Sequence, residues 1–441
     1  MQDRHYILRD VHIIHINGAI KRDHYVEVKE GKIKTIGKMP VPKEKCHLPV
    51  ISGDNNWLTA GMYNTHAHTP MTLLRGVADD VPLQVWLEKE IWPREALLDK
   101  EAVMTGTSLA LAEMIRSGTV AFLDMYHLHM DKVFETTLES GIKAVLSRGM
   151  IAFGTEEEQE AKRKEAVRFA NEWNEYGAGR MKGMLFPHAP YTCPPSFLEK
   201  VVEEAAIHEL KVGIHVAETE KECQDHLKKY HKRPITHLAE LGFLERDAIL
   251  THVVHVGEEE WPLLASSSVT VSHNPMSNLK LGSGIAPVTK MKREGIDVTF
   301  GTDSTASNNN LDMFEEMRIA CLLQKGVFQQ PEAIEAKEVF QMATINGAKA
   351  LGFGDDGLIQ EGAPADFILI DKKAFHLQPE QNIFSHLVYS ASGHDVTDVF
   401  VDGVCLMRKR ELQTLDEEKI YYEANRSFKQ LEEKKQRGVQ R

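Results

Sequence analysis

Short apolar runs alternate with longer amphipathic segments through the middle of the chain. Eight of these runs have the length and composition of buried strands, and they cover 58–66, 119–125, 142–150, 182–188, 211–217, 248–254, 268–273 and 297–303. The segments between them, such as 156–177 and 196–210, have helical periodicity. Eight β–α alternations in roughly 300 residues predict a (β/α)8 barrel.

The two ends of the chain have a different pattern. Residues 6–18 alternate apolar and polar side chains, and residues 24–37 predict a hairpin that turns at Glu30–Gly31. Near the C-terminus, residues 365–371 predict a buried strand, and residues 397–412 predict a second hairpin. We therefore expect both termini to build one small sheet domain.

Two details complete the C-terminal pattern. The second hairpin is predicted to turn at Asp402–Gly403. After Leu415 the chain is charged and helical in pattern, which is typical of a solvated surface helix.

The first barrel strand ends in two histidines one residue apart, His66 and His68. Residues i and i+2 of an extended backbone point to the same side, so both imidazoles can reach one point. Neutral imidazole is the commonest protein ligand for a divalent metal such as zinc. The alternative is a chance pair on a half-exposed strand, in a chain that contains 21 histidines.

Further polar residues fall at the ends of later strands. They are His188 on strand four, His215 on strand five, His252 on strand six, His273 on strand seven and Asp303 on strand eight. Closure of a barrel brings the carboxyl ends of its strands around one mouth, where the active sites of such barrels lie. Histidine or aspartate at these strand ends therefore predicts a functional site at that mouth.

Three histidines and one carboxylate can hold a zinc-like ion and leave one position for water. Such an ion lowers the pKa of a bound water from about 15.7 to about 7, and an acid and a base must then move protons. Glu218 lies three residues past His215 and can face the same mouth. His252 supplies an imidazole that need not be a ligand.

The formal net charge of −13 and the pI of about 5.9 argue against a nucleic acid or an anionic membrane as partner. No apolar run approaches about 20 residues, and the N-terminus lacks the pattern of a signal peptide. Five scattered cysteines without a Cys-X-X-Cys pair indicate reduced thiols. We therefore expect a cytoplasmic protein with a small-molecule substrate, and the sequence leaves a homo-oligomer open.

The motifs NTHAHT, IHVAET, LTHVVHV, SHNPMSN and GTDSTASNN spread over the whole barrel. Together with GLIQEGAPADFILID and DVFVDGV, they resemble the amidohydrolase superfamily and, within it, the deaminase and chlorohydrolase branch. The resemblance implies an α/β fold in which a distorted (β/α)8 TIM barrel, residues 58–354, carries the catalytic site. A small β-sandwich with a C-terminal helix would be built from both termini, residues 1–57 and 355–441.

The same resemblance implies a set of metal ligands, which are His66, His68, His215 and Asp303. His252 would orient the water and help to deprotonate it, Glu218 would protonate the ring nitrogen of the substrate, and Asp303 would also shuttle a proton. Members with two metals carry a bridging carboxylated lysine at the end of strand four. This chain has His188 there instead, so we predict one divalent ion, Zn²⁺ with Fe²⁺ as the alternative.

Three further stretches resemble the methylthioadenosine/S-adenosylhomocysteine deaminase family, and they are 73–96, 144–150 and 185–193. By that resemblance Glu95 would contact the ribose hydroxyls, Arg148 would bind the carboxylate of an amino-acid tail, and His188 would also contact substrate. One carboxylate suits two hydroxyls, and arginine suits bidentate carboxylate recognition. The alternatives are a surface Glu95 and an Arg148 that pairs with a neighbouring carboxylate. Trp86 could stack on a nucleoside or pack in a helix core.

The predicted reaction is hydrolytic deamination of the adenine of S-adenosylhomocysteine, 5′-methylthioadenosine or adenosine, which yields hypoxanthine and ammonia. The nearest alternative is another aminohydrolase of the same branch that acts on guanine, a triazine or another amino-heterocycle. A remote alternative is a non-catalytic scaffold that keeps the fold as a binding module. Such a protein would be expected to have lost ligands, whereas all of them are present here.

Overall fold

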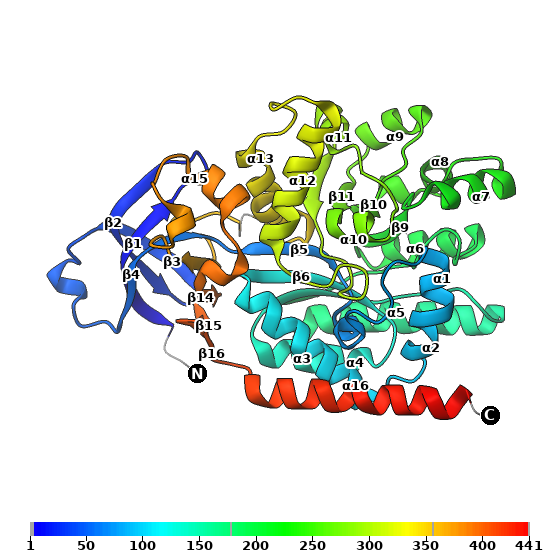
Figure 1. The fold of residues 1–441 in the computed structure, drawn as a ribbon, viewed down its shortest axis with the longest axis horizontal. Helices are drawn as coiled ribbons and strands as arrows, with labels where there is room; N and C mark the ends of the chain where they lie inside the picture. The colour runs from blue at the N-terminus through cyan, green and yellow to red at the C-terminus, as the bar shows by residue number, and fades with distance from the viewer. Residues whose placement is uncertain (1–3, 177–178, 355–356, 440–441) are drawn as a thin grey trace.

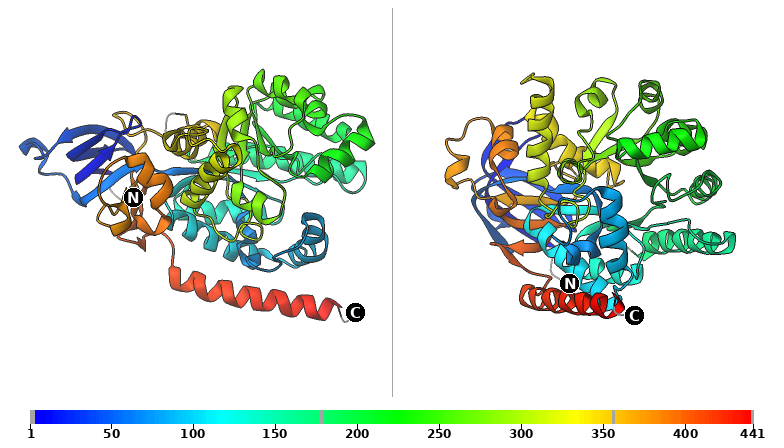
Figure 2. Two further views of the ribbon diagram at one scale, coloured as in Figure 1. Left: turned by 45° about the horizontal axis from the view of Figure 1, so that its top comes forward. Right: turned by 45° about the vertical axis from the view of Figure 1, so that its right-hand side comes forward.

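The computed structural model describes residues 4–176, 179–354 and 357–439. Figure 1 shows a barrel of strands and helices beside a separate sheet domain, which combines the blue N-terminal strands with orange and red strands from near the C-terminus. The last helix leaves this sheet domain and runs along the flank of the barrel, and the turned views in Figure 2 agree with this arrangement.

Among the described residues, eight parallel strands form the barrel as two four-stranded sheets. In chain order they are β5 (Met62–Ala67), β6 (Thr119–Tyr126), β7 (Lys143–Arg148), β8 (Met181–Gly183), β9 (Val212–Val216), β10 (Ala248–His252), β11 (Thr270–His273) and β12 (Asp297–Phe300). The bridges Leu185–Val212 and Ala67–Asp303 join the two sheets at both edges, so the strands close into a cylinder. The predicted barrel is confirmed.

Helices follow the barrel strands, as the amphipathic runs predict. They are α3 (Lys100–Arg116), α4 (Met130–Ser140), α5 (Glu156–Tyr176), α6 (Pro195–Ile207), α7 (Glu220–Tyr230), α8 (Pro234–Glu240), α9 (Trp261–Ala265), α10 (Pro275–Lys280), α11 (Val288–Arg293), α12 (Met313–Phe328), α13 (Ala336–Gln341) and α14 (Gly347–Ala350). The predicted helix 156–177 begins at Glu156, and its predicted last residue lies outside the described ranges. Within those ranges, no helix combines the length and the apolar character that a bilayer span requires.

Both ends of the chain build one mixed sheet. Its strands, in sheet order, are β16 (Glu411–Leu412), β15 (Val404–Arg408), β14 (Val396–Val401), β13 (Phe367–Ile370), β4 (Val50–Ala60), β1 (His5–Ile14), β2 (Ile20–Lys29) and β3 (Lys32–Lys38). The two hairpins turn at Glu30–Gly31 and Asp402–Gly403, as predicted. Leu8, Val26 and Phe400 belong to a core that is separate from the core of the barrel.

The sheet domain from both termini is therefore confirmed, and it forms one continuous hydrogen-bonded sheet. The bounds 1–57, 58–354 and 355–441 remain a prediction, and residues 355–356 lie outside the described ranges. The chain passes from β4 into β5 at Gly61. A Cβ atom there would lie 2.1 Å from Val120 Cγ1, so only glycine fits this close approach of the two domains.

A buried ion pair ties the barrel to the sheet domain. Lys143, the first residue of β7, is 3% exposed, and its ammonium group contacts the carboxylates of Asp366 and Asp402. Asp366 is fully buried just before β13 and also accepts the backbone amide of Asp402. Because buried charges are tolerated only while they are paired, strand β7 and the sheet domain hold each other in place.

The last helix, α16 (Glu417–Val439), packs one face against the barrel, and this face includes Ile420, Ala424, Ser427 and Leu431. Further along the helix, Glu432 Oε1 lies 2.8 Å from Arg94 Nε, and Lys434 Nζ lies 2.7 Å from Asp99 Oδ2. Asp99 is also the N-cap of α3, where its carboxylate accepts the amide of Ala102. The helix is therefore attached to the segment that precedes α3.

We expect Lys143→Met to lower the free energy of unfolding by about 3–5 kcal/mol, because it leaves Asp366 buried without its cation. Urea unfolding followed by circular dichroism measures this loss. The control Lys434→Met breaks an exposed ion pair and should cost less than about 1 kcal/mol. Equal losses in the two variants would contradict the role of the buried pair.

Candidate metal centre and active site

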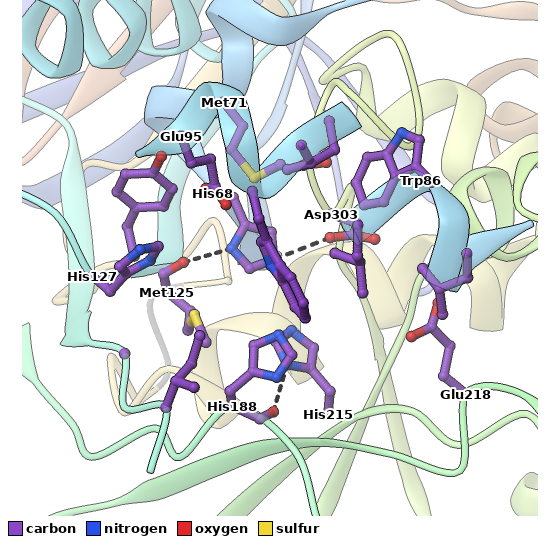
Figure 3. Close-up of a pocket in the computed structure, with 18 of the residues that line it drawn as sticks. His68, Met71, Trp86, Glu95, Met125, His127, His188, His215, Glu218 and Asp303 are labelled. Atoms are coloured by element: carbon purple, nitrogen blue, oxygen red, sulfur yellow. Dashed lines mark hydrogen bonds and ion pairs between the residues drawn. The ribbon is translucent and has the colours of Figure 1, made fainter. Parts of the chain in front are cut away.

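Four side chains with metal-binding donors meet at the carboxyl end of the barrel strands. His66 lies in β5 and His68 directly after it, His215 lies in β9, and Asp303 follows β12. His68 Nε2 lies 3.2 Å and His66 Nε2 lies 3.5 Å from Asp303 Oδ1. His215 Nε2 lies 3.1 Å from His66 Nε2. Figure 3 shows His68, His215 and Asp303 pointing toward one another, so the four residues predicted as ligands lie together.

Three of the spacings between these donors suit a small tetrahedral ion. With Zn–N distances of about 2.0–2.1 Å, the edges of a tetrahedral site are about 3.3 Å long, close to the 3.1–3.5 Å that separates His66 from His215 and Asp303 from His66 and His68. The donors form two groups that share His66, one with His68 and Asp303 and one with His215 and His252. Imidazole binds metal in its neutral form. Burial lowers the pKa of His66 to about 4, although its hydrogen bond to Asp303 acts in the opposite direction. Burial also holds the pKa of His215 well below its usual value.

Backbone carbonyls orient two of the imidazoles. His68 Nδ1 donates to the carbonyl of Met125 at 2.5 Å, and His215 Nδ1 donates to the carbonyl of His188 at 2.6 Å. Both bonds are drawn in Figure 3. Because the proton lies on Nδ1, the Nε2 lone pair of each ring is free to face the other donors, as in histidine ligands of metal sites.

Asp303 is held through both its backbone and its side chain. Its φ of 59° lies in the left-handed region, which costs free energy for a non-glycine residue and is typical of functional positions. Its amide donates to the carbonyl of His66 at 2.9 Å. While Oδ1 faces the histidines, Oδ2 accepts hydrogen bonds from Ser277 Oγ at 2.5 Å and Ser307 Oγ at 3.0 Å.

Glu218 lies beside the four donors, in the loop between β9 and α7, and is 5% exposed. Burial, reinforced by the charge of Asp303, raises the pKa of Glu218 to about 8. At neutral pH the side chain therefore carries a proton that it can donate. Ser283 Oγ donates to Glu218 Oε1 at 3.3 Å, and the amide of Glu218 donates to Glu222 Oε2 at 2.9 Å.

His252, the last residue of β10, faces Glu218 across the site. Its Nε2 lies 3.7 Å from Glu218 Oε2. On the other side of the ring, Nδ1 accepts hydrogen bonds from Asn274 Nδ2 at 3.2 Å and Asn278 Nδ2 at 3.0 Å. These two amides hold the ring, so Nε2 is the atom that can contact water in the site.

A largely apolar cavity opens beside these residues. One wall is the segment α1 (Leu83–Val85), η3 (Trp86–Ile91) and α2 (Trp92–Glu95). Trp86 is 4% exposed, as a core residue would be, and also lines the cavity. Figure 3 places Trp86 and Glu218 toward one end of the cavity and Glu95 and His127 toward the other. Burial raises the pKa of Glu95, against the effect of the nearby Tyr126 hydroxyl.

Two of the predicted substrate contacts line this cavity and one does not. Glu95 and His188 are lining residues, and His188 Nδ1 is 3.0 Å from Thr192 Oγ1. Arg148 pairs with Glu165, at 2.7 Å between Nε and Oε2, and its Nη1 donates to the carbonyl of Gly149. The backbone next to Arg148 reaches the cavity at Gly149. The carboxylate-binding role of Arg148 stays a prediction.

His273, at the end of β11, does not line the cavity, unlike the residues predicted at several other strand ends. It is 1% exposed and lies against Phe300, and it is not among the described residues that line the cavity.

Sequence reasoning missed several residues of the site. Tyr126 and His127 line the cavity, but the predicted strand 119–125 stopped before them, whereas β6 ends at Tyr126. Polar residues directly after a barrel strand, the signal used elsewhere, would have found His127. Asn274 and Asn278 stand within SHNPMSN, and their i,i+4 spacing at α10 puts both amides on one face.

The chain matches the Amidohydrolase family over residues 57–406. It is 51% identical to a 5-methylthioadenosine/S-adenosylhomocysteine deaminase of Halalkalibacterium halodurans, over 94% of this chain and 95% of the relative. It is 45% identical to a 5′-deoxyadenosine deaminase of Methanosarcina acetivorans, over 92% and 93%. Among solved structures, an adenosine deaminase from Xanthomonas campestris with bound zinc has a TM-score of 0.89 and 34% identity, covering 97% of this chain and 98% of that chain.

We expect the purified chain to bind one divalent ion and His215→Ala to bind it more than about 100-fold more weakly. Loss of a ligand should exceed the roughly 10–100-fold cost of losing a partner that only supports a ligand. Competition with a chromophoric chelator and elemental analysis measure the affinity and the ratio of ion to chain. His188→Ala is the control, because it keeps the backbone carbonyl that orients His215. An ion retained in full by His215→Ala would contradict the predicted ligand set.

Proposed function

The chain belongs to the amidohydrolase family and, within it, to the methylthioadenosine/S-adenosylhomocysteine deaminases, and on that premise we propose that it deaminates adenine nucleosides. One water is consumed at adenine C6, and the products are the hypoxanthine nucleoside and ammonia. The observation that carries the proposal is the position of a protonated Glu218 beside three imidazoles and a carboxylate. The relatives of this chain that are named as deaminases support the same reaction.

In this proposal the ion is Zn²⁺, held by His66, His68, His215 and Asp303. A bound zinc ion lowers the pKa of a water toward neutrality and so makes a nucleophile available. The donor spacing and the neutral imidazoles of His66 and His215 support this choice, and so does the zinc named in the similar structure. Ser277 and Ser307 would keep Asp303 aligned while the other donors hold their positions.

The chain's own residues then move the protons. Glu218 would donate its proton to adenine N1, which makes C6 more electrophilic. His252, fixed at Nδ1 by two amides, would orient the attacking water through Nε2. As water attacks C6, Asp303 would take one of its protons and deliver it to the departing amine, so that the C–N bond breaks and ammonia leaves. The second proton of the water, left on the C6 hydroxyl of the tetrahedral intermediate, would return to Glu218 as the C6 carbonyl forms. All three side chains that act on these protons are buried.

The cavity supports a nucleoside as substrate. The apolar side chains Leu83, Trp86 and Leu87 would cover the flat base. Glu95 would accept hydrogen bonds from the two ribose hydroxyls at the far end, with His188 as a further contact. The guanine and triazine alternatives share the same metal donors, so the identity of the preferred base rests on this cavity.

We expect ammonia release from 5′-methylthioadenosine, S-adenosylhomocysteine or adenosine by zinc-loaded enzyme, and none after the metal is stripped. Glu218→Gln, which cannot protonate N1, should lower kcat by at least about 100-fold, the lower end of a general acid's contribution, while it still binds zinc. A coupled ammonia assay with product analysis measures both. Near-normal turnover by zinc-loaded Glu218→Gln would remove the proposed acid, and activity only on guanine or a triazine would favour the rival function.

The ion pair between Arg148 and Glu165 allows a test of the proposed carboxylate-binding role of Arg148. We expect Arg148→Met to lower kcat/KM for S-adenosylhomocysteine roughly 10–100-fold, since hydrogen bonds to charged groups contribute about 1.5–3 kcal/mol. Glu165→Gln frees the guanidinium from an exposed partner and should raise the same value by up to about 5-fold. Neither change should affect 5′-methylthioadenosine, which has no carboxylate. Equal effects on the two nucleosides would remove the assignment.

A further inference from the structure

Glu316 is a fully buried carboxyl group that takes no part in the proposed chemistry. It lies in the first turn of α12 and is 0% exposed. Burying a carboxyl group is costly unless its oxygens are hydrogen-bonded. Oε1 accepts from Asn308 Nδ2 at 2.6 Å, and Oε2 accepts from the backbone amide of Met276 at 3.3 Å. One side chain therefore bonds to two segments that follow different barrel strands, the loop with Asn308 after β12 and helix α10 after β11.

The first of these bonds leads to the backbone of Asp303. Asn308 Nδ2, besides its bond to Glu316, donates to the carbonyl of Thr302 at 2.7 Å. That carbonyl belongs to the peptide group that leads directly into Asp303, whose φ of 59° needs support from its surroundings. The amide of Asn308 also donates to the carbonyl of Ser304 at 2.9 Å, so the turn after Asp303 closes on the same asparagine.

The second bond leads to the side chain of Asp303. Met276 lies in α10, and the next residue, Ser277, donates to Asp303 Oδ2. The same short helix presents Asn278 to His252 Nδ1. Glu316 thus fixes the start of a helix that supports both the carboxylate of Asp303 and the ring of His252.

We propose that Glu316 is a positioning residue, which holds the backbone and the carboxylate of Asp303 in register by bonding to Asn308 and Met276 at once. An acidic residue in the first turn of a helix is ordinary when it is exposed, where it only complements the helix dipole. Glu316 differs because it is fully buried and both its oxygens are bonded outside its own helix. Its effect reaches the reaction and the ion only through Asp303.

The test compares Glu316→Leu with Glu316→Gln. The leucine removes both bonds and should lower kcat for 5′-methylthioadenosine about 10–100-fold and zinc affinity by about 10-fold, the usual cost of losing a partner that supports a metal ligand. KM should change less than about 3-fold, because no contact with the nucleoside is lost. Glutamine keeps one acceptor oxygen for Asn308 but turns its NH2 group toward the amide of Met276, which is also a donor. It should therefore recover part of the loss, with kcat and zinc affinity between those of the leucine variant and the natural enzyme.

Glu27→Leu is the matched control. Glu27 is 1% exposed in the sheet domain, where it pairs with Lys34 and Lys45, far in the fold from the barrel mouth. The Glu27→Leu substitution should lower the unfolding temperature while kcat and zinc affinity stay unchanged. If Glu316→Leu behaves in the same way, or if glutamine fails as leucine does, the proposal is overturned.

A second variant decides the matter if Glu316→Leu does not fold. Asn308→Ala removes the side-chain amide that joins Glu316 to the carbonyl of Thr302, and it leaves the bond from the Met276 amide to Glu316 in place. It should lower kcat and zinc affinity by about 5–10-fold with KM unchanged, near the low end of the roughly 10–100-fold cost of losing a partner that supports a metal ligand. An Asn308→Ala enzyme with normal kcat and normal affinity would overturn the proposal. Chelator competition needs no substrate, so it tests Glu316 even if the enzyme proves to act on a different heterocycle.

Discussion

The site depends on keeping several polar groups close together and buried away from bulk solvent. His66, His215 and Asp303 are buried, and so is Glu218. In such surroundings the imidazoles of His66 and His215 lose their protons and Glu218 keeps its own, because burial disfavours the charged form of each group. At His68 the adjacent carboxylate of Asp303 outweighs burial and raises the pKa. A metal needs neutral imidazoles, and an acid catalyst needs the retained proton. One physical condition, burial away from bulk solvent, therefore prepares His66, His215 and Glu218 for both functions.

Burial alone would not keep these groups in place, since each must also be oriented. Carbonyls of Met125 and His188 orient two imidazoles, and serine hydroxyls align Asp303. These partners are backbone groups or small polar side chains, and they lie at the end of a strand, as Met125 does in β6, or in the segments that follow the strands. The barrel brings the strand ends together, and these partners orient the side chains there.

The barrel and the meeting of the four candidate metal ligands could be predicted from the sequence because their signals are local or repeated. His66 and His68 stand two residues apart in one strand, and His215 and Asp303 each end an apolar run. Barrel topology then brings such positions together whatever their separation in the chain. The partners of these residues could not be predicted in the same way. The bond of Glu316 to Met276 and the pairing of Arg148 with Glu165 depend on how particular helices pack against the barrel. The hydrophobic periodicity of the sequence does not predict this packing.

The position of α16 has a consequence for how the enzyme would respond to disturbance. The helix is anchored to Arg94 and Asp99, on either side of the short stretch that places Glu95 in the cavity wall. Fraying of its outer turns would disturb this wall, where we propose that Glu95 contacts the ribose, before it disturbs the candidate metal ligands at the strand ends. Heat or mild denaturant should then weaken substrate saturation before it weakens the chemical step, so we expect the stability of the last helix to limit the temperature range of substrate binding.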